Sequence, residues 1–205
     1  MIKKIAIVGS GSHSSSSINL LLKYFSITNM GIYDNSFGEG AQELIRSIEL
    51  IGGIDDIKVN QDVFLSIGDN SLRKKCFLKF KDQVIKKNLF HNNSIQEKEV
   101  ILGVANQIFA HTYINSKTII GDNNIVNTGA IIEHDCLIGS HNHISVGAKV
   151  CGKTSIGNEC FIGSGSVILN NLSICDNVII GAGAVVIRDI VNPGTYVGNP
   201  VKKIK

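Results

Sequence analysis

The chain has 205 residues, 43% of them hydrophobic, which is enough for one large domain or two small ones with apolar cores. The formal net charge is only +3, and the sequence has no basic stripe of the kind that binds nucleic acid. Small anionic ligands remain possible. The apolar run from Ile5 to Val8 is too short for a signal-peptide core, and no segment is long enough to span a membrane, so we expect a cytoplasmic protein. Five cysteines without a C-x-x-C pair predict free thiols that fill space in the core.

The first 88 residues alternate predicted strands and helices, which is typical of a Rossmann-like βαβαβ domain. KKIAIVG and VFLSIGDN predict strands, and GIYDN predicts a strand that ends at Asp34. INLLLKYF has helical spacing. GEGAQELIRSIELIGG predicts a helix with one apolar face, and SLRKKCFLKFKDQVIKK predicts a last helix capped by Asn70 or Ser71. The apolar face of the first of these two helices would consist of Ala41, Leu44, Ile45, Ile48 and Ile51.

From Leu102 to Val186 every sixth residue is aliphatic without a gap, and the residue four positions further on is usually small. A hexapeptide repeat of this kind predicts a parallel β-helix, in which each unit forms a strand and a corner and three units close one coil. Residues 89–205 are therefore expected to form a second, all-β domain.

Three histidines interrupt the repeat in the stretch IIEHDCLIGSHNHISVGA, residues 131–148. His134 differs from the others because Glu133 precedes it and Asp135 follows it. A carboxylate holds an imidazole in one tautomer and raises its basicity, as a general base requires.

A zinc site is the competing interpretation, since the β-helical carbonic anhydrases hold zinc with three histidines. The spacing H-x6-H-x-H found here does not match the ligand spacing of that family, so we expect no metal. A zinc-dependent β-helix lyase is kept as the alternative from a different class of enzyme.

The motifs NTGAIIEHDCLIGSHNHISVGAKVCG, IGNECFIGSGSVIL, IIGAGAVV and VGNPVKKIK closely resemble the sialic acid O-acetyltransferase-type sugar acetyltransferases, which include the nucleotide-sugar N-acetyltransferase of the bacillosamine pathway. VGSGSHSSSS, IYDN, GGIDDI and VFLSIGDNSLRKK extend the likeness through the N-terminal part. The resemblance implies a left-handed β-helix, a homotrimer and acetyl-CoA as co-substrate.

The resemblance also implies roles for particular residues. His134 would be the catalytic base and Asp135 its assistant, while His143 and the backbone of Gly152 would lie near the thioester carbonyl. Ser164 and Ala182 would line the acetyl-CoA site. His141 matches no functional position of the family and is expected on the surface.

The loop GSGSHSSSS lies between a predicted strand and helix, where backbone N–H groups and the helix dipole bind phosphates. By resemblance, Gly11, Ser12 and His13 would contact a nucleotide sugar, Asp34 and Asn35 its base or ribose, and Gly68 its phosphates. The family usually has G-x-S-G-H-G here, so Ser12 and Ser14 depart from the pattern. These changes leave the identity of the base and the sugar open.

The predicted function is transfer of acetyl from acetyl-CoA to the 4-amino group of a nucleotide-linked 4-amino-4,6-dideoxy sugar. We expect direct attack on the thioester, because no Ser or Cys stands beside His134 as a nucleophile. The nearest alternative keeps the fold and acetylates a hydroxyl group of sialic acid instead.

Overall fold

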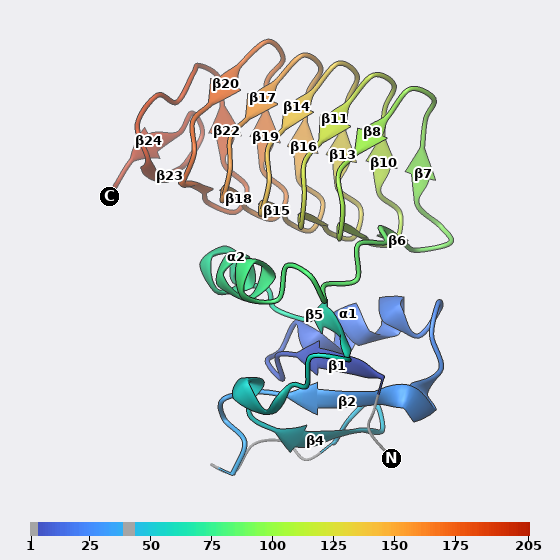
Figure 1. Cartoon of the computed structure of the whole chain (residues 1–205). Coiled ribbons are helices and arrows are strands. Elements are labelled where there is room, and N and C mark those ends of the chain that lie inside the picture. Colours follow the sequence, from blue (N-terminus) through green and yellow to red (C-terminus); the bar gives the residue numbers. More distant parts are fainter. Residues whose placement is uncertain (1–3, 39–43) are drawn as a thin grey trace. The chain divides into compact units, whose positions relative to one another are not determined.

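The computed structural model describes residues 4–38 and 44–205, and the chain divides into two compact units, Met1–Lys86 and Lys87–Lys205 (Figure 1). Each unit is built around its own apolar residues.

The first unit is a five-stranded sheet with the order β3-β4-β2-β1-β5. Strands β4, β2, β1 and β5 run parallel, and the apolar side chains of β2, β1 and β5 are almost entirely buried. The carboxyl ends of parallel strands meet at one edge of a sheet, so the loops after β1, β2 and β5 are neighbours. The elements of this unit are β1 (Ile5–Val8), α1 (Ser14–Leu21), η1 (Ile27–Asn29), β2 (Met30–Tyr33), β3 (Leu44–Ile45), β4 (Ile48–Gly52), η2 (Ile54–Asp56), β5 (Asp62–Leu65) and α2 (Asn70–Lys79).

The helix predicted over residues 38–53 is wrong: within the described residues this segment forms the β3–β4 hairpin. Arg46 and Ser47 both have positive φ (53° and 62°), which is the backbone of a two-residue hairpin loop and breaks a helix. Ile48, Leu50 and Gly52 are buried in alternation, so the apolar pattern has period two. Ala41, predicted on the helical face, lies outside the described residues.

The ends of the two α-helices also differ from the predictions. Helix α1 begins at Ser14 and so includes the serines that were expected in a turn. Helix α2 is capped by Asp69, whose side chain accepts a hydrogen bond of 2.7 Å from the backbone N–H of Leu72, and not by Asn70 or Ser71. The helix ends at Lys79, where the predicted helical sequence continued to Lys87.

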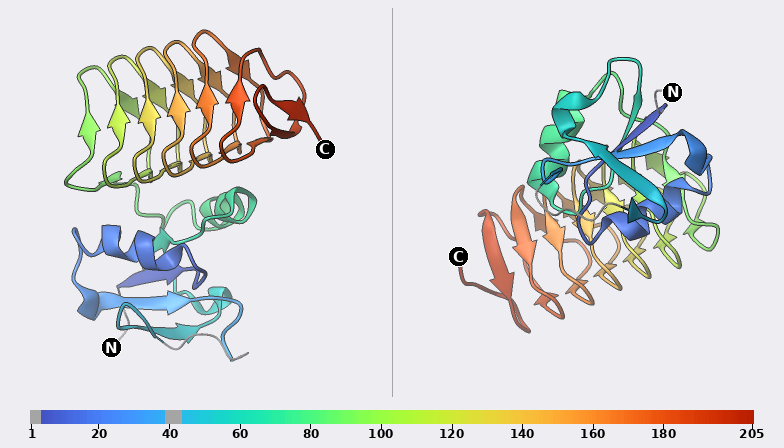
Figure 2. Two further views of the ribbon diagram at one scale, coloured as in Figure 1. Left: turned by 180° about the vertical axis from the view of Figure 1, so that it is seen from behind. Right: turned by 90° about the horizontal axis from the view of Figure 1, so that it is seen from below.

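The second unit is a parallel β-helix of three sheets (Figure 2). From β6 to β22 each strand pairs with the strand 18 residues away, and the chain ends in β23 and an antiparallel β24. The β13 sheet contains β7 (Ile95–Gln96), β10 (Tyr113–Ile114), β13 (Ile131–Ile132), β16 (Lys149–Val150), β19 (Val167–Ile168) and β22 (Val185–Val186). The β14 sheet contains β8 (Ile101–Leu102), β11 (Ile119–Ile120), β14 (Leu137–Ile138), β17 (Ser155–Ile156) and β20 (Ser173–Ile174). The β15 sheet contains β6 (Leu89–Phe90), β9 (Gln107–Ile108), β12 (Ile125–Val126), β15 (His143–Ile144), β18 (Phe161–Ile162), β21 (Val178–Ile180), β23 (Gly194–Val197) and β24 (Lys202–Lys203).

The inward aliphatic residues form one continuous core from Ile108 to Val186, as the six-residue period predicts. The coils begin earlier than the aliphatic series, because β6 already pairs with β9. Small polar residues at the corners bond to the next coil: Thr118 Oγ1 donates to the carbonyl of Glu133 at 2.8 Å, and Thr154 Oγ1 donates to that of Leu169 at 3.0 Å. Their place in the repeat is therefore set by hydrogen bonding as well as by size.

A ladder of buried asparagines connects the β14 sheet to the β15 sheet, and we call this edge the asparagine corner. The Oδ1 atom of Asn106 accepts hydrogen bonds from the backbone N–H and the side-chain amide of Asn124, at 2.8 and 3.1 Å. Asn124 Oδ1 in turn accepts from the backbone N–H of Asn142 at 2.7 Å. These side chains are fully buried, so the ladder fixes the stacking of successive coils.

We expect Asn124→Ala to lower the free energy of unfolding by about 2–3 kcal/mol, because it leaves Asn142 N–H and Asn106 Oδ1 buried with a bond missing. Urea unfolding followed by circular dichroism measures the loss. The exposed Asn170 of the same unit provides the control, and Asn170→Ala should change stability by less than about 0.5 kcal/mol. Equal effects of the two substitutions would show that the ladder does not stabilise the coils.

Candidate active site

His134 and Asp135 lie at the turn that joins the β13 sheet to the β14 sheet, which we call the His134 corner. His134 Nδ1 donates a hydrogen bond of 2.8 Å to Asp135 Oδ2, and the two side chains are 52% and 42% exposed. The hydrogen bond from His134 is the main reason that the pKa of Asp135 is lowered. The carboxylate therefore holds Nδ1 of the imidazole, and Nε2 is the nitrogen left for a substrate.

Gly152 occupies the equivalent position one coil beyond His134. A Cβ atom built on Gly152 would lie 2.8 Å from both Cε1 and Nε2 of His134, closer than real Cβ contacts allow. The backbone of the next coil thus forms a wall against the imidazole, and only glycine leaves room for the ring in this orientation. The structure brings Gly152 directly to His134, a contact that the family resemblance did not specify.

Glu133, the other carboxylate beside His134, is engaged elsewhere. Its Oε2 accepts a hydrogen bond of 2.6 Å from Asn115 Nδ2 in the preceding coil. Asp135 and not Glu133 therefore orients His134.

His143 begins β15 and is 7% exposed. Asn127 Nδ2 donates to His143 Nε2 at 3.1 Å, and Phe161 packs edge-on against the ring with centroids 5.1 Å apart. Asn127 opens the NTGAIIEHD motif, but the sequence gives no sign of its contact with His143. The three side chains come from consecutive coils and hold His143 in one orientation.

His141 is not on the surface as expected: it is 9% exposed. Asn123, one coil earlier at the asparagine corner, donates from Nδ2 to His141 Nδ1 at 2.9 Å. Stacking of equivalent residues from adjacent coils explains this burial, which the isolated hexapeptide does not reveal.

Ser164 and Ala182 are both exposed and lie at the turn that joins the β15 sheet to the β13 sheet. Ser164 Oγ is 2.9 Å from Ser145 Oγ. Each is followed by a glycine with positive φ, and the same position holds a glycine in two earlier coils. We call this edge the glycine corner; its glycines, with φ of 64° to 69°, are Gly129, Gly147, Gly165 and Gly183.

The backbone conformation alone does not explain the glycine corner. Lys153 and Glu159 adopt the same positive φ, near 59°, at the other two corners. A Cβ atom on any of the four glycines would meet nothing within 4 Å. What glycine provides here is a side-chain-free ridge, a signal visible in the sequence as glycine at every eighteenth position.

The His134 corner and the glycine corner are far apart within one chain. Four residues lie between Gly129 and His134, so the two corners are at most about 16 Å apart along an extended backbone. The chain alone therefore does not bring His134 to a ligand lying on the glycine corner.

The loop after β1 is held to the loop after β5 by Ser14, the residue that departs from the family's last glycine. Its buried hydroxyl group donates to the carbonyls of Gly9 and Ser66, at 2.9 and 3.1 Å. Gly11 and Ser12 are exposed at the tip of this loop. Glycine at this position would leave the backbone flexible, whereas Ser14 ties the two loops together through these hydrogen bonds.

His13 and Gly68 lie side by side: a Cβ atom on Gly68 would be 3.3 Å from that of His13. Below them the fully buried guanidinium of Arg73 donates to the carbonyls of Ile67 and Gly68 and to Asn70 Oδ1, at 3.3, 3.2 and 2.8 Å. Burial, with a contribution from Arg73, lowers the pKa of His13 to about 4. His13 is therefore neutral near pH 7 and presents an uncharged imidazole at this edge.

Asp34 follows β2 and faces the same loop. Its carboxylate accepts hydrogen bonds from the backbone N–H groups of Ser10 (2.7 Å) and Ser36 (2.9 Å) and from the Ser36 hydroxyl (2.7 Å). Burial acts to raise the pKa of Asp34, but these hydrogen bonds outweigh it and keep the pKa below its usual value. Asn35 is exposed beside it. The N-terminal residues predicted to bind a nucleotide sugar thus gather on the loops after β1, β2 and β5.

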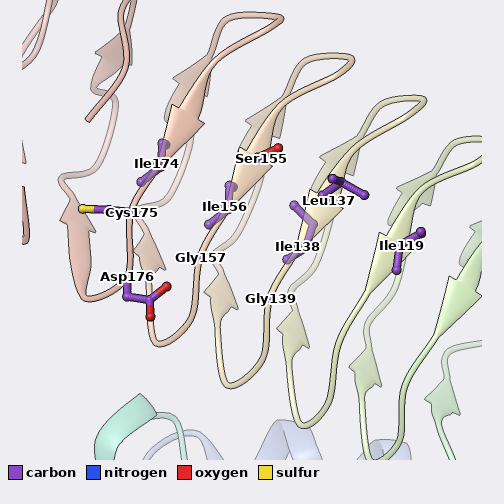
Figure 3. A pocket seen from close by; sticks show the side chains of 10 residues that line it. All are labelled: Ile119, Leu137, Ile138, Gly139, Ser155, Ile156, Gly157, Ile174, Cys175 and Asp176. Carbon is purple, nitrogen blue, oxygen red and sulfur yellow. The ribbon is translucent and has the colours of Figure 1, made fainter. Parts of the chain in front are cut away.

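A shallow apolar groove of about 410 Å³ runs along the outer face of the β14 sheet (Figure 3). Ile119, Leu137, Ser155 and Cys175 are among its lining residues, and none of the predicted site residues takes part.

Two further observations concern the described residues alone. Residues 4–38 and 44–205 contain no group of three His, Cys, Asp or Glu side chains placed to hold a metal ion. Within the same ranges no helix has the length and apolarity needed to cross a membrane.

Comparison with known proteins gives a family match in each of the two units. Residues 4–80 match the PglD N-terminal domain, and residues 153–188 match the bacterial transferase hexapeptide repeats. No curated protein matches the chain.

Solved structures give likeness over the whole length. The acetyltransferase domain of PglB from Neisseria gonorrhoeae in complex with acetyl coenzyme A is 26% identical, with a TM-score of 0.85 and all of both chains covered. PerB from Caulobacter crescentus, in complex with CoA and GDP-perosamine, is 27% identical, with a TM-score of 0.86 over 100% of this chain and 99% of that one. WeeI from Acinetobacter baumannii, at 23% identity and a TM-score of 0.87 over 98% and 99% of the chains, supports the fold alone. The predicted Rossmann-like domain followed by a left-handed β-helix, and the resemblance to this group of sugar acetyltransferases, are confirmed.

We expect Gly152→Ala to push the His134 ring away and to break its 2.8 Å bond to Asp135, since the new methyl group would overlap the imidazole. Because His134 is half exposed, the ring has room to move and the fold should persist. Histidine NMR spectra would then show a changed His134 signal. Gly11→Ala, at a position with open space around it, is the control and should leave that signal unchanged; an unchanged His134 signal in Gly152→Ala would contradict the described contact.

Proposed function

Because the chain joins a PglD N-terminal domain to a hexapeptide-repeat β-helix, it is an acyltransferase of the sugar N-acetyltransferase type, and we propose that it acetylates the 4-amino group of a nucleotide-linked 4-amino-4,6-dideoxy sugar. Acetyl-CoA is the co-substrate. The observation that carries the proposal is His134, fixed through Nδ1 by Asp135 and against Gly152, with Nε2 left for a substrate.

In the proposed reaction His134 is the general base. The sugar amine attacks the thioester carbonyl and a C–N bond forms, while Nε2 of His134 takes the proton that the amine loses. The C–S bond then breaks, the amide forms, and the CoA thiolate leaves and receives a proton. A positioned base contributes roughly 10²- to 10⁴-fold to such a rate.

Direct attack is favoured over an acetyl-enzyme because the thiols near His134 are unsuited to be nucleophiles; burial raises the pKa of Cys151, beside Gly152, as well as that of Cys136. Cys136, two residues from His134, is fully buried and donates from Sγ to the carbonyl of Cys151 at 3.3 Å. Burial raises the pKa of Cys136 to about 11. The thiolate is the reactive form of cysteine, and it is scarce at such a pKa.

The glycine corner is the proposed binding line for acetyl-CoA. Its ridge lets an extended pantetheine arm approach the backbone along Ser164 and Ala182, because the four glycines of the ridge carry no side chain. His143, held by Asn127 on the adjoining β15 sheet, would meet the thioester carbonyl. Gly152, which lies against His134, would offer its N–H to the same oxygen.

A site built in this way needs a second copy of the chain, because the His134 corner and the glycine corner lie at opposite ends of a β13-sheet strand, up to about 16 Å apart. We propose a homotrimer in which the His134 corner of one subunit faces the glycine corner of the next. The exposed Ile101, Ile119 and Leu137 stand on neighbouring strands of the β14 sheet and supply apolar surface for such an interface.

The nucleotide sugar is assigned to the loops of the N-terminal unit. Gly11, Ser12 and His13 would contact it, Asp34 and Asn35 would receive the ribose or the base, and Gly68 would lie near the phosphates. Asp34 is already fixed by Ser10 and Ser36, so it is oriented before any ligand binds. The reaction is placed in the cytoplasm, where acetyl-CoA is available.

We expect the wild-type enzyme to release CoA thiol from acetyl-CoA with one of a panel of GDP-, UDP- and dTDP-linked 4-amino-6-deoxy sugars. His134→Ala should lower kcat by roughly 10²- to 10⁴-fold with an unchanged thermal midpoint, because it removes the base and no packing contact of the core.

Free and CMP-linked sialic acid complete the panel. Release of CoA thiol with sialic acid alone would mean that the enzyme acetylates a hydroxyl group of sialic acid and not an amine. Normal turnover by His134→Ala would remove the proposed base. Stoichiometric zinc in protein purified without chelator, with no release of CoA on any sugar, would favour the lyase.

A further inference from the structure

Charged residues alternate along the outermost positions of the His134 corner. Glu99, Lys117, Asp135 and Lys153 are spaced by one coil each, and all have φ between 59° and 62°. The coils are in register, since the backbone N–H of Asp135 donates to the carbonyl of Ser116 at 3.1 Å and that of Lys153 donates to the carbonyl of His134 at 2.9 Å. Successive strands are about 4.8 Å apart, so an exposed lysine lies on each side of Asp135.

Asp135 is the group that His134 and the two lysines share. The hydrogen bond from His134 is the largest influence on its pKa; burial opposes it, and the charges of His134, Lys117 and Lys153 lower the pKa further. Of the neighbouring acids, Glu133 is bonded to Asn115, and Glu99 lies two coils away. At the equivalent position on the far side of Lys153 stands the neutral Asn171. The lysines therefore supply the cations that face Asp135 from the adjoining coils.

We propose that Lys117 and Lys153 are positioning residues for the acetyl transfer. They flank the Asp135 carboxylate from the adjoining coils and offset part of its charge, so that Asp135 can orient the His134 ring while its charge favours the imidazolium form less. The inference rests on the proposed function, in which neutral His134 is the base.

The sign of the effect follows from the charges. Each lysine disfavours the imidazolium form of His134, both directly and by neutralising part of the Asp135 charge. Two charges about 6 Å apart in water shift a titration midpoint by about half a pH unit, and by less when salt screens them. Loss of a lysine should therefore keep His134 protonated up to a higher pH.

The test is the pH dependence of kcat/KM for Lys117→Met, Lys153→Met and the double variant, with acetyl-CoA and the accepted amino sugar. Methionine keeps the length and the apolar stem of lysine. We expect the acidic limb of the profile to move up by about 0.3–0.5 pH unit for each lysine and by about twice that in the double variant, while the plateau at high pH stays within about twofold. A merely structural role would lower the plateau instead.

Two controls sharpen the comparison. Lys153→Arg keeps the charge and should reproduce the wild-type profile. Arg188, exposed at the same corner but three coils from His134, lies about 14 Å away, beyond the screening length, so Arg188→Met should not move the limb. Repeating the double variant in 1 M salt should remove most of its shift.

Unchanged acidic limbs in both single variants and in the double variant would overturn the inference, as would a shift toward lower pH. Failure of the proposed function looks different. In that case His134→Ala keeps its activity, or the wild type does not turn over any amino sugar, whatever residue stands at positions 117 and 153.

Discussion

The chemistry of this chain depends on the backbone hydrogen bonds that stack one coil of the β-helix on the next with an offset of 18 residues. Because the offset is constant, residues that are distant in sequence become neighbours along each corner. The stacking places Gly152 against the imidazole of His134 and sets a lysine on either side of Asp135. It also aligns four glycines into one open ridge. The buried asparagines and the corner hydroxyl groups maintain this offset, so core stability and site geometry have the same origin.

In the proposed function the two units divide the work of substrate binding and reaction. In the N-terminal unit, backbone loops after parallel strands are fixed by side chains before any ligand binds: Ser14 joins two loops, Asp34 is held by serines, and buried Arg73 supports the segment beside His13. In the β-helix, rigid corners present single side chains to the outside. The proposed base on one corner and the glycine ridge on another would suit a reaction that needs two substrates aligned, if two copies of the chain meet as proposed.

Most of the β-helix could be predicted from the sequence. An inward aliphatic residue at every sixth position sets the strands, the core and the corners. The Glu-His-Asp motif likewise predicts a base at His134, and the structure adds its contacts with Asp135 and Gly152. The predictions that were wrong concern features that depend on tertiary contacts. The segment around Arg46 and Ser47 has apolar residues compatible with a helix, yet two residues with positive φ turn it into a hairpin. The burial of His141 and the role of Asn127 depend on partners one coil away, which a reading of single hexapeptides does not reveal.

Whether the two corners serve one reaction can be tested most directly by mixing two inactive variants. His134→Ala lacks the base, and Gly147→Glu blocks the ridge with a side chain whose backbone conformation Glu159 already adopts at another corner. If each site combines the His134 corner of one subunit with the glycine corner of another, subunit exchange should restore about a quarter of the wild-type sites at equal mixing. No recovery after verified exchange would contradict a site shared between copies of the chain.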